Sequence, residues 1–107
     1  MNLFVIRHAD AGNREEWDGD DSERPLSELG HSQARVLGAH FDRNGIAVEA
    51  ILASPLVRAW QTAADFREGA RLEKEAEPCE LLAPEAGKKR KLAKAIAAAV
   101  VVLRNGL

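Results

Sequence analysis

The chain has 107 residues, 46% of them hydrophobic and 30% charged, which excludes an intrinsically disordered chain and a membrane-spanning one. This length allows one domain, so residues 1–107 are expected to form a single domain. The net charge of −2 gives no general electrostatic basis for binding nucleic acid, and none is expected as a partner.

The apolar run at residues 3–6 predicts a buried strand, and Arg7 and His8 follow it directly. Neutral histidine is a competent nucleophile near pH 7, and a planar guanidinium can hold two phosphate oxygens. Neighbouring side chains of a strand point to opposite faces, so both groups reach one ligand only if the strand has ended. The pair therefore suggests phosphoryl transfer at the end of a strand, although an ordinary surface turn carries the same residues.

The stretch at residues 12–23 carries six acidic residues around Trp17 and predicts a solvated loop over the site. Its Asp18-Gly19-Asp20-Asp21 segment invites comparison with a calcium loop. The ligand spacing is not that of an EF-hand and no flanking helices are apparent, so no metal site is assigned.

A first helix is predicted from about Ser27 to Asn44, with Gly45 ending it. Its apolar positions recur at helical spacing and should pack on the sheet; they are Ala34, Leu37, Gly38 and Phe41. His31 and His40 are interpreted as polar residues on the helix surface.

Residues 51–53 predict a second buried strand, followed by a helix with Ser54 as N-cap and Pro55 as first helical residue. Arg58 then lies in the first turns, where the helix start favours an anion, although it is also compatible with an ordinary surface arginine. Ala59, Ala63 and Phe66 form the buried stripe of this helix. Trp60 lies off that stripe.

The apolar segment from Ala93 to Leu103 is too short to cross a bilayer and predicts a buried helix or strand. Cys79 is the single cysteine, which excludes an internal disulfide and fits a reducing compartment. Met1 and Asn2 begin no signal peptide, so a cytoplasmic protein is expected.

Three segments together resemble the histidine phosphatase superfamily, also called the phosphoglycerate mutase-like family, in the family's order. They are Arg7-His8, then Pro25-Leu26-Ser27-x-x-Gly30-x-x-Gln33-Ala34, then Ser54-Pro55-Leu56-x-Arg58-Ala59-x-Gln61-Thr62-Ala63. The short loop from His8 to Arg24 is most similar to the small SixA-type phosphohistidine phosphatase branch. The resemblance covers roughly residues 1–85.

This resemblance implies an α/β fold, a three-layer sandwich with a mostly parallel sheet flanked by helices, in an incomplete version. It implies that His8 is the nucleophile and that Arg7 and Arg58 hold the phosphate, with Arg24 close by. No metal and no cofactor are implied. The implied substrate is a phosphorylated protein, in particular protein phosphohistidine, or a small phosphate compound, and no membrane partner or oligomeric state is indicated.

The chain departs from the family pattern in three places. Ala9 stands where many members have glycine. Family members carry a second catalytic histidine in a Gly-His block after a late strand, whereas here residues 100–107 resemble that strand with Asn105 near the histidine's place. Glu80 and Glu85 are the carboxylates near the general-acid region, and neither is assigned that role.

Three hypotheses follow from these observations. The chain is a small metal-independent phosphatase with reduced activity, a degenerate phosphate-binding module that turns over poorly, or a C-terminally truncated gene product without activity of its own.

Overall fold

The computed structural model describes residues 2–80 and 99–104. Its regular elements are β1 (Asn2–Arg7), η1 (Arg14–Glu16), η2 (Asp21–Glu23), α1 (Glu28–Arg43), β2 (Val48–Ala53), α2 (Val57–Ala70), β3 (Glu77–Pro78) and β4 (Ala99–Arg104). Both predicted early strands and both predicted helices are confirmed. The late apolar segment contains a strand, as the sequence indicated.

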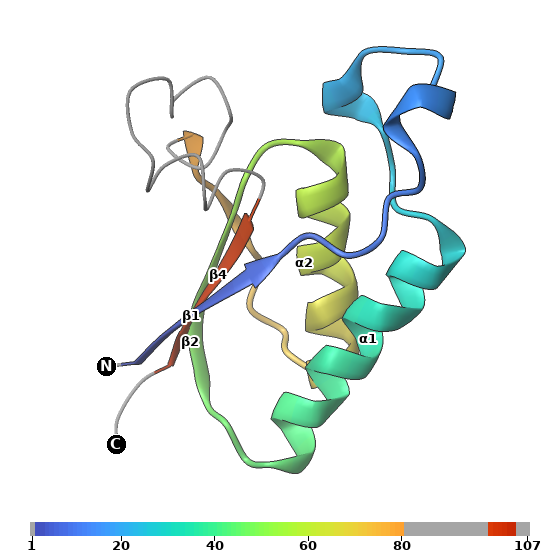
Figure 1. The fold of residues 1–107 in the computed structure, drawn as a ribbon. Helices are drawn as coiled ribbons and strands as arrows, with labels where there is room; N and C mark the ends of the chain where they lie inside the picture. Colours follow the sequence, from blue (N-terminus) through green and yellow to red (C-terminus); the bar gives the residue numbers. More distant parts are fainter. Residues whose placement is uncertain (1, 81–98, 105–107) are drawn as a thin grey trace.

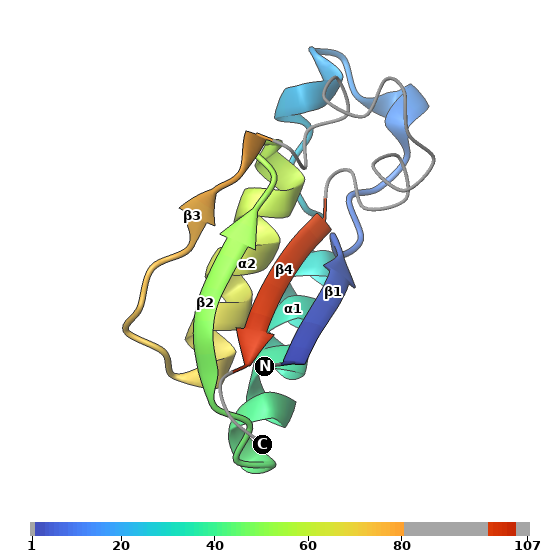
Figure 2. The same ribbon diagram turned by 90° about the vertical axis from the view of Figure 1, so that its left-hand side faces the viewer.

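The four strands form one sheet in the order β1-β4-β2-β3. Figure 2 shows β1, β2 and β3 running in one direction, with β4 running the opposite way between β1 and β2. The sheet is thus mostly parallel in strand direction, although both pairings of β4 are antiparallel. In this register Arg7 pairs with Ala99 and Asn2 with Arg104, so β4 begins at the end of the sheet where β1 stops.

Helices α1 and α2 lie side by side on the same face of the sheet (Figure 1). The α/β class is confirmed, and the described residues build two of the three layers that the resemblance implies. The core lies between helices and sheet. There the Phe41 ring packs edge-to-face against the rings of Phe66 and Phe4, with ring centroids 4.9 Å and 5.1 Å apart. The fully buried Ile51 belongs to the same core cluster.

The two helices approach closely because glycines lie at their crossing. A Cβ atom on Gly38 would lie 2.2 Å from the carbonyl oxygen of Phe66, and one on Gly69 would lie 2.0 Å from that of Arg35. No side chain fits in such a gap, so both positions require glycine for this packing.

The start of α1 is as predicted, whereas the start of α2 is not. Ser27 is the N-cap of α1, and its hydroxyl accepts a hydrogen bond from Gly30 N at 3.1 Å. The predicted cap at Ser54 is wrong, because α2 begins at Val57 with Leu56 as an N-cap that makes no side-chain bond. The buried Ser54 hydroxyl accepts instead from Leu56 N at 3.3 Å, which closes the turn before the helix.

Among the residues that the structure describes, no helix is both long and apolar enough to cross a membrane.

Candidate active site

His8 is the first residue after β1, so the strand ends where the sequence required. Its Nδ1 lies 2.7 Å from the carbonyl oxygen of Ala9. Because a carbonyl oxygen only accepts, Nδ1 carries the proton and donates it to this bond. The lone pair of the neutral ring is therefore on Nε2, which is the arrangement a nucleophilic histidine needs.

The surroundings of His8 favour this neutral form. Burial lowers the pKa of His8 below its ordinary value, and the positive charges of Arg58, Arg24 and Arg7 lower it further, although the bond to Ala9 acts in the opposite sense. At neutral pH the imidazole is thus mostly uncharged and able to attack.

Arg58 is the second residue of α2 and is only 7% exposed. Its Nη1 donates to the backbone oxygen of Asp21 at 2.7 Å, and its Nη2 donates to the carboxylate Oδ2 of the same residue at 3.1 Å. The buried Nε has no hydrogen-bond partner among the described residues. An unsatisfied buried donor costs about 1–3 kcal/mol, so Arg58 holds a position that an incoming anion would stabilise.

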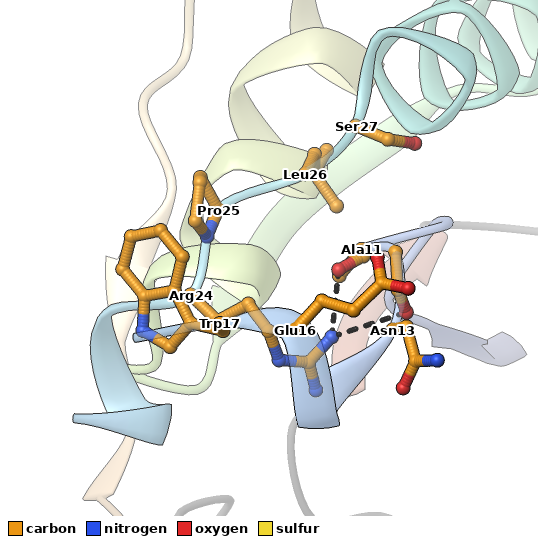
Figure 3. Close-up of a pocket in the computed structure, with 9 residues that line it drawn as sticks. Ala11, Asn13, Glu16, Trp17, Arg24, Pro25, Leu26 and Ser27 are labelled. Atoms are coloured by element: carbon orange, nitrogen blue, oxygen red, sulfur yellow. Dashed lines mark hydrogen bonds between the residues drawn. The ribbon is translucent and has the colours of Figure 1, made fainter. Parts of the chain in front are cut away.

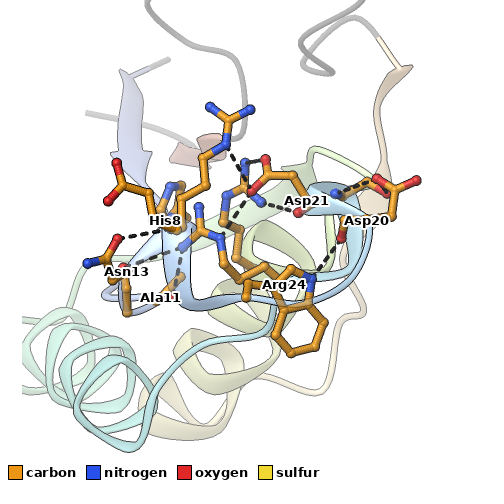
Figure 4. A network of polar contacts seen from close by, with 12 residues as sticks. His8, Ala11, Asn13, Asp20, Asp21 and Arg24 are labelled. Atoms are coloured by element: carbon orange, nitrogen blue, oxygen red, sulfur yellow. Dashed lines mark hydrogen bonds and ion pairs between the residues drawn. The ribbon is translucent and has the colours of Figure 1, made fainter.

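Arg24 joins this cluster from the end of the loop at residues 12–23 and is 9% exposed. Figure 4 shows it between the Asp21 carboxylate, to which Nε donates at 3.1 Å, and the Ala11 carbonyl, to which Nη1 donates at 2.7 Å. Arg7 is exposed at the end of β1. The structure places Arg7 and His8 at the end of β1 and brings Arg24 and Arg58 together on Asp21. The charges of all three arginines lower the pKa of His8.

Both helices hold the loop that carries His8. The Thr62 hydroxyl on α2 donates to the backbone oxygen of Arg58 at 2.7 Å and accepts from Ala9 N at 3.0 Å. From α1, the side-chain oxygen of Gln33 accepts from Asp10 N at 3.0 Å. These roles were not predicted from the sequence, although a threonine on the buried face of α2 is a signal that could have indicated the first.

Close backbone contact fixes the same loop against the start of α1. Ser27 N donates to the backbone oxygen of Asp10 at 3.0 Å, and the Ser27 hydroxyl donates to the Asp10 carboxylate at 2.6 Å. Hydrogen bonding from Ser27 is the largest cause that keeps the pKa of Asp10 below its ordinary value. A Cβ atom on Gly30 would lie 2.0 Å from the backbone oxygen of Asp10, so only glycine permits this approach.

We expect Gly30→Ala to reduce any turnover by about 10- to 100-fold, because α1 must withdraw from the loop and small misplacement of a catalytic group is costly. Steady-state assay beside Ser32→Ala, an exposed position of the same helix, measures this. Unchanged kinetics for Gly30→Ala would show that the loop does not depend on α1.

The other two histidines lie on α1. Nδ1 of His31 lies 2.5 Å from the carboxylate of Asp65 on α2, and Arg35 contacts the same carboxylate at 3.5 Å. His40 is exposed beside Asn44 at the end of the helix. His31 therefore connects the two helices.

The loop at residues 12–23 contains the two short helices η1 and η2 and contributes Asp21 to the arginine cluster. Within residues 2–80 and 99–104, no three metal-binding side chains come together.

A pocket of about 220 Å³ opens beside the cluster formed by Asp21, Arg24 and Arg58 (Figure 3). Its lining residues are Ala11, Gly12, Asn13, Glu16, Trp17, Arg24, Pro25, Leu26 and Ser27.

Two residues named in the sequence analysis, Glu85 and Asn105, lie outside the described residues. Arg104, which precedes Asn105, pairs with Asn2 at the end of β1 opposite to Arg7. In this register β4 begins beside Arg7 and ends at the opposite end of the sheet, because it runs antiparallel to β1.

The chain is similar in sequence to known proteins. The sequence profile described as Histidine phosphatase superfamily (branch 1) matches residues 3–82. Phosphohistidine phosphatase SixA of Escherichia coli (strain K12) is 31% identical over 84 residues, which are 78% of this chain and 50% of the relative. The 8-oxo-(d)GTP phosphatase of Mycolicibacterium smegmatis is 38% identical over 60 residues, 56% of this chain and 18% of the relative.

Solved structures show the same likeness. The protein histidine phosphatase SixA complexed with tungstate superposes with a TM-score of 0.68 at 28% identity, over 78% of this chain and 52% of that one. A SixA structure from Agrobacterium tumefaciens superposes with a TM-score of 0.62 at 20% identity, over 76% of this chain and 52% of that one. This likeness supports the fold alone. The chain spans about half the length of these SixA proteins.

Proposed function

Because the chain belongs to the histidine phosphatase superfamily, we propose that it removes phosphoryl groups from protein phosphohistidine by way of a phosphorylated His8. One observation carries the proposal: a neutral imidazole with its lone pair on Nε2 lies in the field of two buried guanidinium groups. One of these, Arg58, has a buried donor without a partner in the described part of the chain.

The proposed reaction has two steps. Nε2 of His8 attacks phosphorus, the bond from phosphorus to the substrate nitrogen breaks, and that nitrogen takes a proton from water. A second water molecule then attacks phosphorus on His8 and gives a proton to the hydroxide left by the first, which releases phosphate and restores the imidazole. Covalent catalysis of this kind replaces one difficult step with two easier ones.

In this proposal the arginines bind the phosphoryl oxygens and balance the charge that spreads over them. Guanidinium groups suit this task because their planar donors match phosphate oxygens in pairs. Arg58 and Arg24 offer them from a buried setting and Arg7 from the exposed end of β1. Burial strengthens the interactions of Arg58 and Arg24 relative to water.

Two points support a phosphohistidine substrate. The relatives named SixA carry that activity in their names. A phosphorus–nitrogen bond is also labile enough to break without a strong general acid. The proposal places the protein in the cytoplasm, where the single Cys79 would remain reduced.

A second candidate is a phosphate-binding module that turns over slowly. It is favoured by the placement of the other histidines, since His31 is engaged by Asp65 and His40 is exposed at the far end of α1. Neither supplies the second catalytic histidine that family members use.

Assay of the purified protein with a phosphohistidine peptide and with an aryl phosphate tests both candidates. Turnover of the peptide in preference to the aryl phosphate supports the phosphatase. Anion binding without turnover of either supports the binding module, and the absence of both contradicts the proposed site.

We expect Arg58→Ala to weaken tungstate binding by about 1.5–3 kcal/mol, the range for hydrogen bonds to a charged group. Calorimetric titration measures the difference, with Arg43→Ala on the exposed end of α1 as the control. Equal affinity of wild type and Arg58→Ala would remove Arg58 from the anion site.

A further inference from the structure

One carboxylate holds both buried arginines of the site. Asp21 accepts from Arg24 Nε through Oδ1 and from Arg58 Nη2 through Oδ2, each at 3.1 Å, and its backbone oxygen accepts from Arg58 Nη1 at 2.7 Å. Arg14 Nε adds a longer contact of 3.7 Å from an exposed side chain. Figure 4 shows Asp21 at the centre of this cluster.

The contacts to Asp21 use only one edge of the Arg58 guanidinium. They occupy the end edge, formed by Nη1 and Nη2, and leave the side edge, which includes the buried and unpartnered Nε. A guanidinium has five donors in a rigid plane, so anchoring one edge fixes the direction of the other. Asp21 therefore orients Arg58 without using the donor that an anion would take.

The positive charges of Arg24 and Arg58 give a second reason for a carboxylate at Asp21. Arg24 and Arg58 are cations, both nearly buried and both close to His8, and like charges repel strongly where water is excluded. Asp21 lies between them and balances part of that charge. Although burial acts to raise the pKa of Asp21, hydrogen bonds and charges from Arg24 and Arg58 keep it below its ordinary value.

The loop is built to place this carboxylate. The Asp20 side chain caps η2 by accepting from Ser22 N at 3.0 Å, and its backbone oxygen accepts from Trp17 Nε1 at 2.9 Å. These bonds fix the turn that carries Asp21 as its first residue.

We propose that Asp21 is a positioning residue for phosphoryl binding: it holds Arg24 and Arg58 together and aims the side edge of Arg58 at the phosphate. The inference rests on the proposed function, since it assigns the anion to this cluster. A carboxylate that instead occupied the anion's own place would act as a competitor, and the experiment separates the two.

Tungstate binding by the full chain is the test, with Asp21→Ala and the isosteric Asp21→Asn, which keeps the shape of the side chain and removes its charge. We expect Asp21→Ala to weaken tungstate binding about tenfold and Asp21→Asn to weaken it by a smaller factor, as lost hydrogen bonds to charged groups do. The matched control is Asp18→Asn, which makes the same charge change at an exposed position of the same loop.

A double-mutant cycle with Arg58 distinguishes positioning from a general structural role. If Asp21 acts through Arg58, Asp21→Ala should weaken binding far less in an Arg58→Ala background than in the wild type, because residues acting through one another are not additive. Thermal unfolding of each variant verifies that it is folded. If Asp21→Ala does not fold, the same cycle is measured with Asp21→Asn.

The outcomes are distinct. Equal or tighter tungstate binding by both Asp21 variants would overturn the inference and identify Asp21 as a competitor of the anion. Additive losses in the cycle would also overturn it. Failure of the wild type itself to bind tungstate would instead refute the proposed function, and the role of Asp21 with it.

Discussion

Replacing His8 by glutamine is expected to reduce turnover of a phosphohistidine peptide by at least about 1,000-fold, because removing a nucleophile removes the covalent route itself. Glutamine keeps much of the side chain's size and its ability to donate to Ala9. It has no lone pair comparable to that of Nε2. Single-turnover and steady-state assays measure the loss.

The matched control is His40→Gln, which makes the same substitution at an exposed histidine of α1 and should leave turnover unchanged. Wild-type protein quenched during turnover should carry an acid-labile, base-stable phosphoryl label, and His8→Gln should carry none. A label that persists in His8→Gln would show that another residue is phosphorylated.

The largest expected loss of stability comes from Phe66→Ala, which should lower the free energy of unfolding by about 3–5 kcal/mol, as for other buried aromatic residues. Phe66 is 1% exposed, and its ring packs against Phe41 between the helices and the sheet. Truncation leaves a cavity at that junction. Urea unfolding followed by circular dichroism measures the change.

Trp60→Ala provides the comparison, because Trp60 is on the same helix but is 40% exposed. Its truncation should lower the free energy of unfolding by less than about 1 kcal/mol, as most surface substitutions do. Similar losses for the two variants would show that the core does not lie between α2 and the sheet.

Most of the fold could be predicted from local patterns. The apolar stripe of α1 and its start near Ser27 could be predicted because helical periodicity and helix-start signals act within a few residues. The start of α2 was misplaced because Ser54 and Pro55 also suit the turn before a helix. The direction of β4 could not be predicted, since an apolar run is the same in both directions.

Part of the candidate site could also be predicted from the sequence, and part could not. The four basic residues of the proposed site could be named from the sequence because they follow strands or lie in motifs that resemble a family. The sequence predicted Asp21 only as one of several acidic residues in a solvated loop. Its role could not be predicted because its ion pair with Arg58 joins residues that are 37 positions apart. The spacing of three between Asp21 and Arg24 was the local signal available. Thr62 was missed because its partners come from another element.

The anchors of the His8 loop have a mechanical consequence. Thr62 holds Ala9 from α2, whereas Gln33 and Ser27 hold Asp10 from α1. The segment that follows His8 is thus hydrogen-bonded to both helices, and we expect a change in their separation to displace the imidazole. The glycine contacts at the helix crossing set the separation of the two helices, so they are expected to influence the position of His8 as well.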